Sequence, residues 1–198
     1  MVRIDPPPPQ RLSAPLFEQL PTNMQLLRIF DPTRHQTQAL TFRQYGSIHR
    51  FDHQRGAVPR NDSERGIYYA ALTLSGCIVE TFGDTGVIEI KEQQLALMEL
   101  NRPLTVLDLR GPGAMRAGSV AALAKTADRT LSQAWSRYFY EVYPQIDGIF
   151  YYNAHNDEPA VALYQRAADA LKIVQVFPLN DNGLRPHIQS AALHIPSR

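Results

Sequence analysis

The chain has 198 residues, of which 44% are hydrophobic, and its formal net charge is +1. This length corresponds to about one domain, and the apolar content excludes a disordered chain. The balanced charge argues against a general nucleic-acid-binding protein, which would usually be basic. The single cysteine, Cys77, excludes an intramolecular disulfide and a multi-cysteine zinc site. Because no apolar run approaches about 18 residues and no apolar signal core opens the chain, we expect a cytoplasmic protein without a membrane partner.

The first third of the chain predicts an arm, a strand and a long loop. Residues 1–20 include Pro6 to Pro9, which favour an extended conformation, so we expect an N-terminal arm before a globular domain over residues 21–198. The apolar run over residues 26–30 predicts a strand that ends at Asp31-Pro32. Residues 40–66 are rich in Arg, His, Asp and Gly, which is typical of loops that can contact a ligand.

The rest of the chain mixes predicted strands and helices without regular alternation, which favours an α+β fold. Strands are predicted at residues 66–70, 87–90, 104–109, 147–154 and 174–179. Apolar spacings of three and four predict helices at residues 74–83 and 131–142, and Ser119 is a candidate N-cap of a short helix through residue 124. Residues 161–171 fit either a helix, or a strand over 161–164 followed by a short helix.

Two local motifs are better explained as ordinary structure than as functional sites. Gly111-Pro112-Gly113 follows a predicted strand, as a dinucleotide-binding turn would, but Arg116 stands where the last glycine of that fingerprint is needed. Proline also lacks the N–H that would face a pyrophosphate. Cys77 lies on the apolar face of its helix, which favours core packing over nucleophilic chemistry.

His49 and His53 are four residues apart and flank Asp52, a spacing that would suit a metal ion on a helix. Arg50 and Arg55 surround them, however, and positive charge beside a cation site is unfavourable. We therefore expect no metal and interpret these histidines as surface residues or as residues whose ring nitrogens are satisfied by hydrogen bonds.

Two charged residues, Arg28 and Glu80, lie at positions where a charge is expected to destabilise the fold. Arg28 lies inside an apolar strand, where an unpartnered charge is expensive to bury. Glu80 lies near the C-terminal end of a predicted helix, where the helix dipole opposes its charge. Each residue alone is compatible with a surface position or a structural ion pair, so their order along the chain matters more than either one.

That order resembles the RES domain family, named for its Arg, Glu and Ser, over about residues 26–164. The resemblance rests on five segments in the family's order: Leu27-Arg28-Ile29; His49-Arg50-Phe51; Gly66-Ile67-Tyr68-Tyr69-Ala70 through Glu80; Leu104 to Leu109; and Asp147 to Asn153. Asn153 stands where the family usually has Ser. Either Tyr68 or Tyr69 can match the family's tyrosine.

The resemblance implies an α+β, ADP-ribosyltransferase-like fold with a split β-sheet core and flanking helices. It also implies a toxin of a bacterial toxin–antitoxin pair that uses NAD⁺ as its substrate. The cognate antitoxin, with an Xre-like DNA-binding region, is then expected to cover the active site. The acceptor of ADP-ribose is a protein, water or phosphate, and we favour a protein because residues 40–66 offer a surface for a macromolecule.

The same resemblance suggests a role for each site residue. Cleavage of the nicotinamide–ribose bond builds positive charge on the ribose, which Glu80 is expected to stabilise. Arg28 and Arg50 suit a pyrophosphate, because guanidinium groups pair with it at two points. Tyr68 or Tyr69 is expected to stack on nicotinamide, and Asn153 to contact ribose. The rival hypothesis is a non-catalytic binding module on the same fold, for which the loss of Ser at residue 153 is the best argument.

Overall fold

The computed structural model describes residues 4–8, 15–56 and 58–195. The strands are β1 (Phe17–Leu20), β2 (Gln25–Phe30), β3 (Tyr45–Gly46), β4 (Arg60–Asn61), β5 (Ile67–Ala71), β6 (Gln94–Leu100), β7 (Leu104–Asp108), β8 (Gly148–Tyr152), β9 (Pro159–Tyr164) and β10 (Leu171–Pro178). The α-helices are α1 (Leu74–Phe82), α2 (Pro112–Arg116), α3 (Arg129–Val142) and α4 (Arg185–Ala192). Short 3₁₀ helices are η1 (Ala121–Lys125), η2 (Gln165–Ala170) and η3 (Asn182–Leu184).

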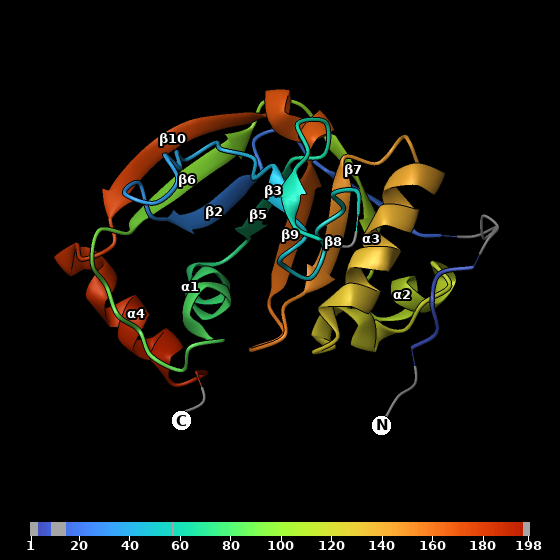
Figure 1. Cartoon of the computed structure of the whole chain (residues 1–198). Coiled ribbons are helices and arrows are strands. Elements are labelled where there is room, and N and C mark those ends of the chain that lie inside the picture. Colours follow the sequence, from blue (N-terminus) through green and yellow to red (C-terminus); the bar gives the residue numbers. More distant parts are fainter. Residues whose placement is uncertain (1–3, 9–14, 57, 196–198) are drawn as a thin grey trace.

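The main sheet is divided into two halves that diverge from one another. Its strand order is β1-β7-β8-β9-β5-β2-β6-β10, and Figure 1 shows it curling across the molecule. Along most of this order neighbouring strands pair over several residues, but the described pairing of β2 with β5 is the single pair Leu27 and Ala71. The two halves therefore separate at β2 and β5, which confirms the expected α+β class with a split sheet.

Helices cover each half of the sheet (Figure 1). α1 packs on β2 and against α4, in a cluster that includes Ile78, Phe82 and Leu95. α3 packs on the other half, where Trp135 and Phe139 join a cluster with residues of β7, β8 and β9. Among the described residues, no helix is both long enough and apolar enough to cross a membrane.

The two predicted long helices form because their ends are capped and one face of each is apolar. The Thr73 hydroxyl accepts a hydrogen bond from the Gly76 N–H at 3.0 Å and starts α1. The Asp128 carboxylate accepts one from the Leu131 N–H at 3.0 Å and starts α3. α1 buries the predicted face at Cys77 and Ile78. For α3 the predicted face is wrong: of Leu131, Trp135, Tyr138 and Val142 only Trp135 is buried, and the other buried residues include Ser132, Ser136 and Phe139.

Other expectations need correction. Residues 87–90 form no strand; the neighbouring strand of this region is β6, which begins at Gln94. Ser119 does not cap η1, which begins after Val120 without a side-chain cap. For residues 161–171 the structure confirms the second alternative, a strand followed by a short helix.

The predicted N-terminal arm is partly integrated into the domain. Its last four residues form β1, which pairs antiparallel with β7. Residues 4–8 lie against α3, where the Trp135 indole N–H donates to the Asp5 carbonyl at 2.9 Å. Residues 1–3 and 9–14, which include Pro9, lie outside the described residues.

Candidate active site

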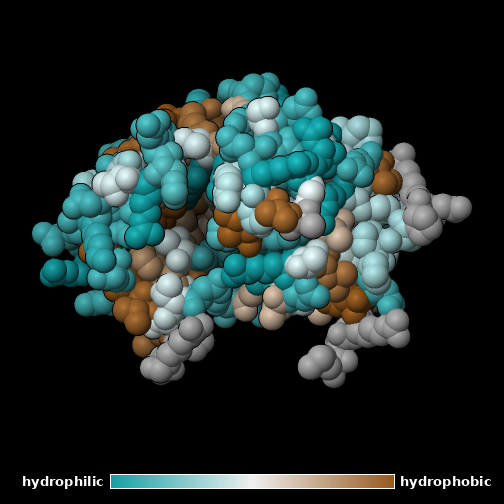
Figure 2. Space-filling model, in the orientation of Figure 1, coloured by the Kyte–Doolittle hydropathy of each residue, from teal (hydrophilic) through white to brown (hydrophobic). Residues whose placement is uncertain are grey.

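A cavity of about 920 Å³ opens where the two halves of the sheet diverge. Its walls come from β2, β5, the C-terminal half of α1 and the segment between β2 and β4. Figure 2 shows a recess on this face, with apolar residues inside it and hydrophilic residues along its rim. The cavity lies within the size range of about 300–1,000 Å³ that is usual for ligand sites.

Arg28 projects from β2 at this divergence and lines the cavity. One guanidinium nitrogen, Nη1, donates to the Thr41 carbonyl at 2.7 Å, and the guanidinium lies 4.4 Å from the centre of the Tyr68 ring. These contacts explain how a half-buried arginine is tolerated in an apolar strand. They also hold its charge at the cavity wall, where other N–H groups remain available for a ligand.

The tyrosine pair of β5 is divided between core and cavity. Successive side chains of a strand point to opposite faces, so Tyr68 and Tyr69 cannot both line the site. Tyr68 is fully buried in the core, and its hydroxyl donates to the Ala39 carbonyl at 2.8 Å. Tyr69 lines the cavity, and its hydroxyl donates to Asp52 at 2.9 Å. Of the pair, Tyr69 is therefore the one that lines the cavity, and the expectation that Tyr68 faces the site is corrected.

Glu80 lies on the last turn of α1 and faces the cavity, where its side chain is reached by solvent. Desolvation by the surrounding protein raises the pKa of this carboxyl, and the nearby Asp84 carboxylate adds to the effect. The Arg50 guanidinium and a hydrogen bond from the Ala154 N–H act in the opposite direction. The site thus holds a carboxylate whose charge is poorly compensated, which suits the stabilisation of a developing cation.

Arg50 approaches Glu80 from the loop that follows β3. Its Nη1 donates to the Thr126 carbonyl, which fixes the guanidinium beside the cavity. Arg28 and Arg50 come from segments far apart in the sequence, and both line the cavity that Glu80 faces.

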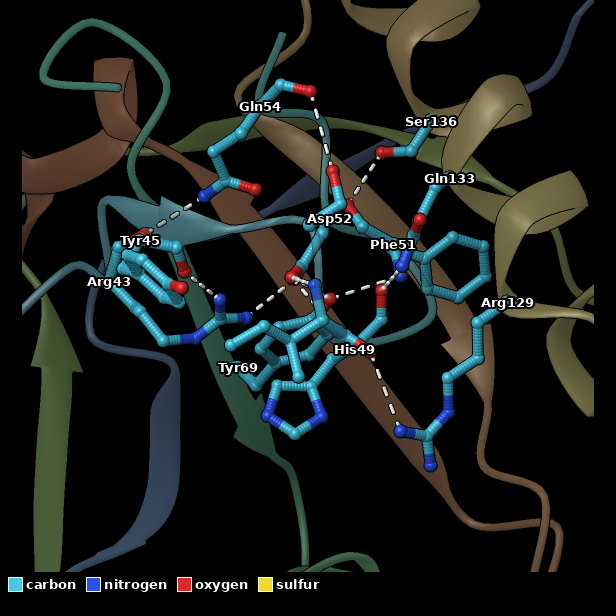
Figure 3. A network of polar contacts seen from close by, with 12 residues as sticks. Arg43, Tyr45, His49, Phe51, Asp52, Gln54, Tyr69, Arg129, Gln133 and Ser136 are labelled. Carbon is cyan, nitrogen blue, oxygen red and sulfur yellow. Dashed lines mark hydrogen bonds and ion pairs between the residues drawn. The ribbon is translucent and has the colours of Figure 1, made fainter. Parts of the chain in front are cut away.

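Asp52 holds this loop in place although its own carboxylate is buried (Figure 3). Its Oδ1 accepts hydrogen bonds from Arg43 at 2.6 Å and from Tyr69 at 2.9 Å. Its Oδ2 accepts from the backbone N–H groups of Ile48 and His49 at 2.5 and 2.9 Å. Burial opposes ionisation, but Arg43 and these N–H donors hold the pKa of Asp52 below its usual value.

Asn153 does not line the cavity. It is fully buried, and its Oδ1 accepts hydrogen bonds from the N–H groups of His155 and Asn156, both at 2.9 Å. Its Nδ2 donates to the Asn156 side chain at 2.6 Å. This geometry corrects the expected contact with a ligand: Asn153 shapes the turn that follows β8, including Ala154, whose N–H reaches Glu80. It is a positioning residue.

Sequence reasoning missed the polar residues at the mouth of the cavity. His49 lines the cavity, and the Arg129 guanidinium donates to the Ile48 carbonyl at 3.4 Å while it pairs with Asp84 at 2.7 Å. His155 lies 3.8 Å from Asp84 on the same wall. The abundance of charged residues in the predicted loop was the one available signal, because the contacts at the mouth join this loop to α3 and to Asp84, which follows α1.

Two other sequence candidates, His53 and Cys77, are buried, and neither ring nitrogen of His53 has a hydrogen-bond partner among the described residues. His53 is fully buried between the rings of Tyr140 and Tyr164, and burial lowers the pKa of its imidazole to about 3. Within the described residues, no cluster of three acidic, histidine or cysteine side chains suits a metal ion. Burial raises the pKa of the Cys77 thiol to about 12, which makes it a poor nucleophile.

The fold and this residue order define a class of protein. The chain belongs to the RES domain family, which matches residues 25–184. A relative from Sinorhizobium fredii (strain NBRC 101917 / NGR234), described as probable toxin y4kH, is 34% identical over 96 residues; the match covers 48% of this chain and 76% of the relative. Among solved structures, a chain of the M. tuberculosis MbcT-MbcA toxin-antitoxin complex matches with a TM-score of 0.59 and 14% identity, covering 88% of this chain and 92% of that chain. At this identity, the structural match shows a shared fold.

Proposed function

We propose that the protein is the toxin of a bacterial toxin–antitoxin pair and that it consumes NAD⁺ in the cavity between the halves of its sheet. It releases nicotinamide and transfers ADP-ribose to an acceptor. The observation that carries this proposal is the convergence of Arg28, Arg50, Tyr69 and Glu80 on one cavity. Membership of the RES domain family and the probable toxin among its relatives support the same conclusion.

The chemistry of the cavity fits a dinucleotide with a cationic ring. Arg28 and Arg50 offer guanidinium groups for a pyrophosphate, which is best held by planar, multiply donating cations. Tyr69 offers an aromatic surface for the flat nicotinamide ring. Glu80 offers a carboxylate, and its attraction to ribose becomes stronger as positive charge grows on the ribose in the transition state.

A protein is the acceptor that the mouth of the cavity favours. Tyr45 and Ile48 line the cavity, yet their side chains are 51% and 37% exposed. Exposed apolar side chains beside a polar site are typical of a surface that contacts another protein. Transfer to a protein therefore remains our proposal for the acceptor, and hydrolysis or phosphorolysis of NAD⁺ would be the outcome without such a target.

The expected protein partner is a cognate antitoxin with an Xre-like DNA-binding region that covers this cavity. The toxin–antitoxin complex of the structural relative supports the existence of such a partner. Both proteins would act in the cytoplasm. This part of the proposal predicts that the chain is toxic when it is expressed alone and harmless when its partner is co-expressed.

The decisive experiment uses NAD⁺ that carries a label on its adenylate half. Purified protein is incubated with it, with and without a bacterial lysate, and nicotinamide, free ADP-ribose and labelled proteins are separated. Nicotinamide release with a labelled protein band supports transfer to a protein. Release with small-molecule ADP-ribose products alone would place the protein among NAD⁺-degrading enzymes.

Glu80→Gln is the variant that ties either result to this cavity, because it removes the charge and preserves the shape. We expect it to fold and to lose nicotinamide release. If wild-type protein leaves NAD⁺ intact under both conditions, the rival hypothesis of a non-catalytic binding module is supported instead.

A further inference from the structure

We infer that His49 is a second catalytic residue, which takes the proton from a hydroxyl acceptor as that acceptor attacks ribose. The inference rests on the proposed function and deepens it, because it assigns the chemical class of the acceptor. An acceptor that needs a base is one that carries an O–H bond, such as water or a Ser or Thr side chain. Inorganic phosphate, already an anion, has no such need.

The first observation is the placement of the imidazole. His49 lines the cavity, and its ring meets the Tyr69 ring edge-on with centres 6.0 Å apart. Figure 3 shows the ring on the side of the network that faces away from Asp52. In the described part of the chain, neither ring nitrogen has a hydrogen-bond partner, so the imidazole has no structural bond to maintain.

The second observation is how firmly the backbone of His49 is held. Its N–H donates to Asp52 at 2.9 Å, and its carbonyl accepts from the Gln133 side chain at 3.0 Å. Both of these partners are almost fully buried. The main chain is therefore fixed on two sides, and the ring contact with Tyr69 restrains the side chain at the cavity wall, as is required of a positioned acid–base group.

The third observation is the place of His49 relative to Glu80. His49 follows Ile48, one of the exposed apolar residues at the mouth through which a protein acceptor would enter. Glu80 lies on α1, accepts the Ala154 N–H and faces Arg50. Asp84, one helical turn beyond Glu80, acts electrostatically on both residues. The two groups thus share one cavity, with Glu80 placed for the sugar and His49 for the incoming acceptor.

The charges around the imidazole favour its neutral form. Burial first, and then Arg43 and Arg129, lower the pKa of His49, while Asp52 and Asp84 oppose this shift. The remaining titratable or charged groups that line the cavity are Arg28, His35, Arg50, Tyr69, Cys77, Glu80, Tyr151 and His155, with Tyr45 at the mouth. A neutral imidazole at physiological pH has the free lone pair that a base requires.

The step balances without any further reactant. The bond between ribose and the nicotinamide nitrogen breaks, and its electron pair leaves with nicotinamide, which becomes neutral. The acceptor oxygen forms the new bond to ribose, and its proton moves to the free imidazole nitrogen. The resulting imidazolium then releases this proton to water.

The following experiment distinguishes a variant that has lost only the general base from one whose cavity is damaged. His49→Gln and wild-type protein are compared with NAD⁺ in water and in the presence of azide, an anionic nucleophile that has no proton to lose. We expect His49→Gln to lower ADP-ribose formation from water by about 100-fold or more, as is usual for a lost general base. Formation of ADP-ribosyl azide should stay within a few-fold of wild type, because Glu80 and the arginines are intact.

His187→Gln is the matched control, since His187 is an exposed residue of α4 that does not line the cavity. It should behave as wild type in both assays. The pH profile gives an independent readout, because protonation of either His49 or Glu80 removes activity in acid. His49→Gln should keep the acidic loss that belongs to Glu80 and lose the one that belongs to the imidazole.

The outcomes distinguish this inference from the function on which it rests. Unchanged hydrolysis by His49→Gln would overturn the inference and leave the proposed function standing. Equal loss with water and with azide would also overturn it, because His49 would then hold the site together. No nicotinamide release from wild-type protein in either medium would overturn both.

Discussion

Asp52→Asn tests the claim that one buried carboxylate fixes the loop that carries His49 and Arg50. The Asp52 side chain is 0% exposed, and its partner Arg43 is 26% exposed. Both carboxylate oxygens accept two hydrogen bonds, so an amide must place its NH₂ group against two donors, whichever way it turns. The variant therefore loses two bonds and the buried charge pair at once.

The expected cost is large for a single isosteric change. Hydrogen bonds to a charged group contribute about 1.5–3 kcal/mol each, so two lost bonds give about 3–6 kcal/mol. Breaking a buried ion pair by removing one partner costs about 3–5 kcal/mol, which agrees with the figure from the two lost hydrogen bonds. Because a domain of this size loses about 2–4 °C in Tm per kcal/mol, the Tm should fall by about 6–24 °C.

Urea unfolding at several pH values is the assay. Asp52 has a lowered pKa when folded, so its stabilisation is fully present above its ordinary value of 3.8 and is lost as the pH falls through the folded value. The difference between wild type and Asp52→Asn should thus be constant near neutrality and shrink in strong acid.

Asp169→Asn provides the comparison, because Asp169 pairs with Arg102 while its side chain is 72% exposed. That variant should cost no more than about 1 kcal/mol. If Asp52→Asn costs as little as Asp169→Asn at neutral pH, the reasoning about the anchored loop is refuted.

Three further variants test other parts of the structure. Glu80→Gln should abolish nicotinamide release and yet raise the Tm at neutral pH, because a carboxyl with a raised pKa destabilises the folded state where it is ionised; an unchanged or lower Tm would contradict this. Arg28→Ala should raise the KM for NAD⁺ strongly, and an unchanged KM in steady-state assays would exclude the pyrophosphate role. His53, whose pKa is lowered to about 3, makes the fold less stable as the pH falls below 6.5, since the unfolded chain binds the proton first. In urea titrations His53→Phe should flatten this acid dependence, and an equally steep loss would show that another group causes it.

Local periodicity was sufficient to predict that Arg28 lies on a strand and Glu80 near the end of a helix. Arg28 in an apolar strand and Glu80 at the end of an amphipathic helix both carry a cost that local sequence reveals. Period-two alternation also establishes that Tyr68 and Tyr69 face opposite ways. It cannot say which of them faces the cavity, because that depends on where Phe42 and Ala39 pack against the sheet.

Residues whose role depends on distant partners could not be predicted in this way. Asp52 becomes an anchor because Arg43 and Tyr69 converge on it from other segments. Asn153 was assigned to a ligand by its place in a family pattern, whereas its hydrogen bonds close a turn within four residues. β6 posed the same difficulty, because it has few sequence signals of its own and is defined by its pairing with β2 and β10.

The divergence of the sheet at Leu27 and Ala71 has a consequence for how the chain is synthesised. β1 belongs to one half, β2 to the other, β5 to the first, β6 to the second, β7 to β9 to the first, and β10 to the second. Neither half is a contiguous stretch of chain, so neither can be completed on the ribosome before the other has begun. The last strand to emerge, β10, borders β6, the strand that supports Arg28 on β2. In a nascent or prematurely terminated chain, β6 therefore lacks its outer neighbour, and the half of the sheet that carries Arg28 is completed only with the C-terminal segment.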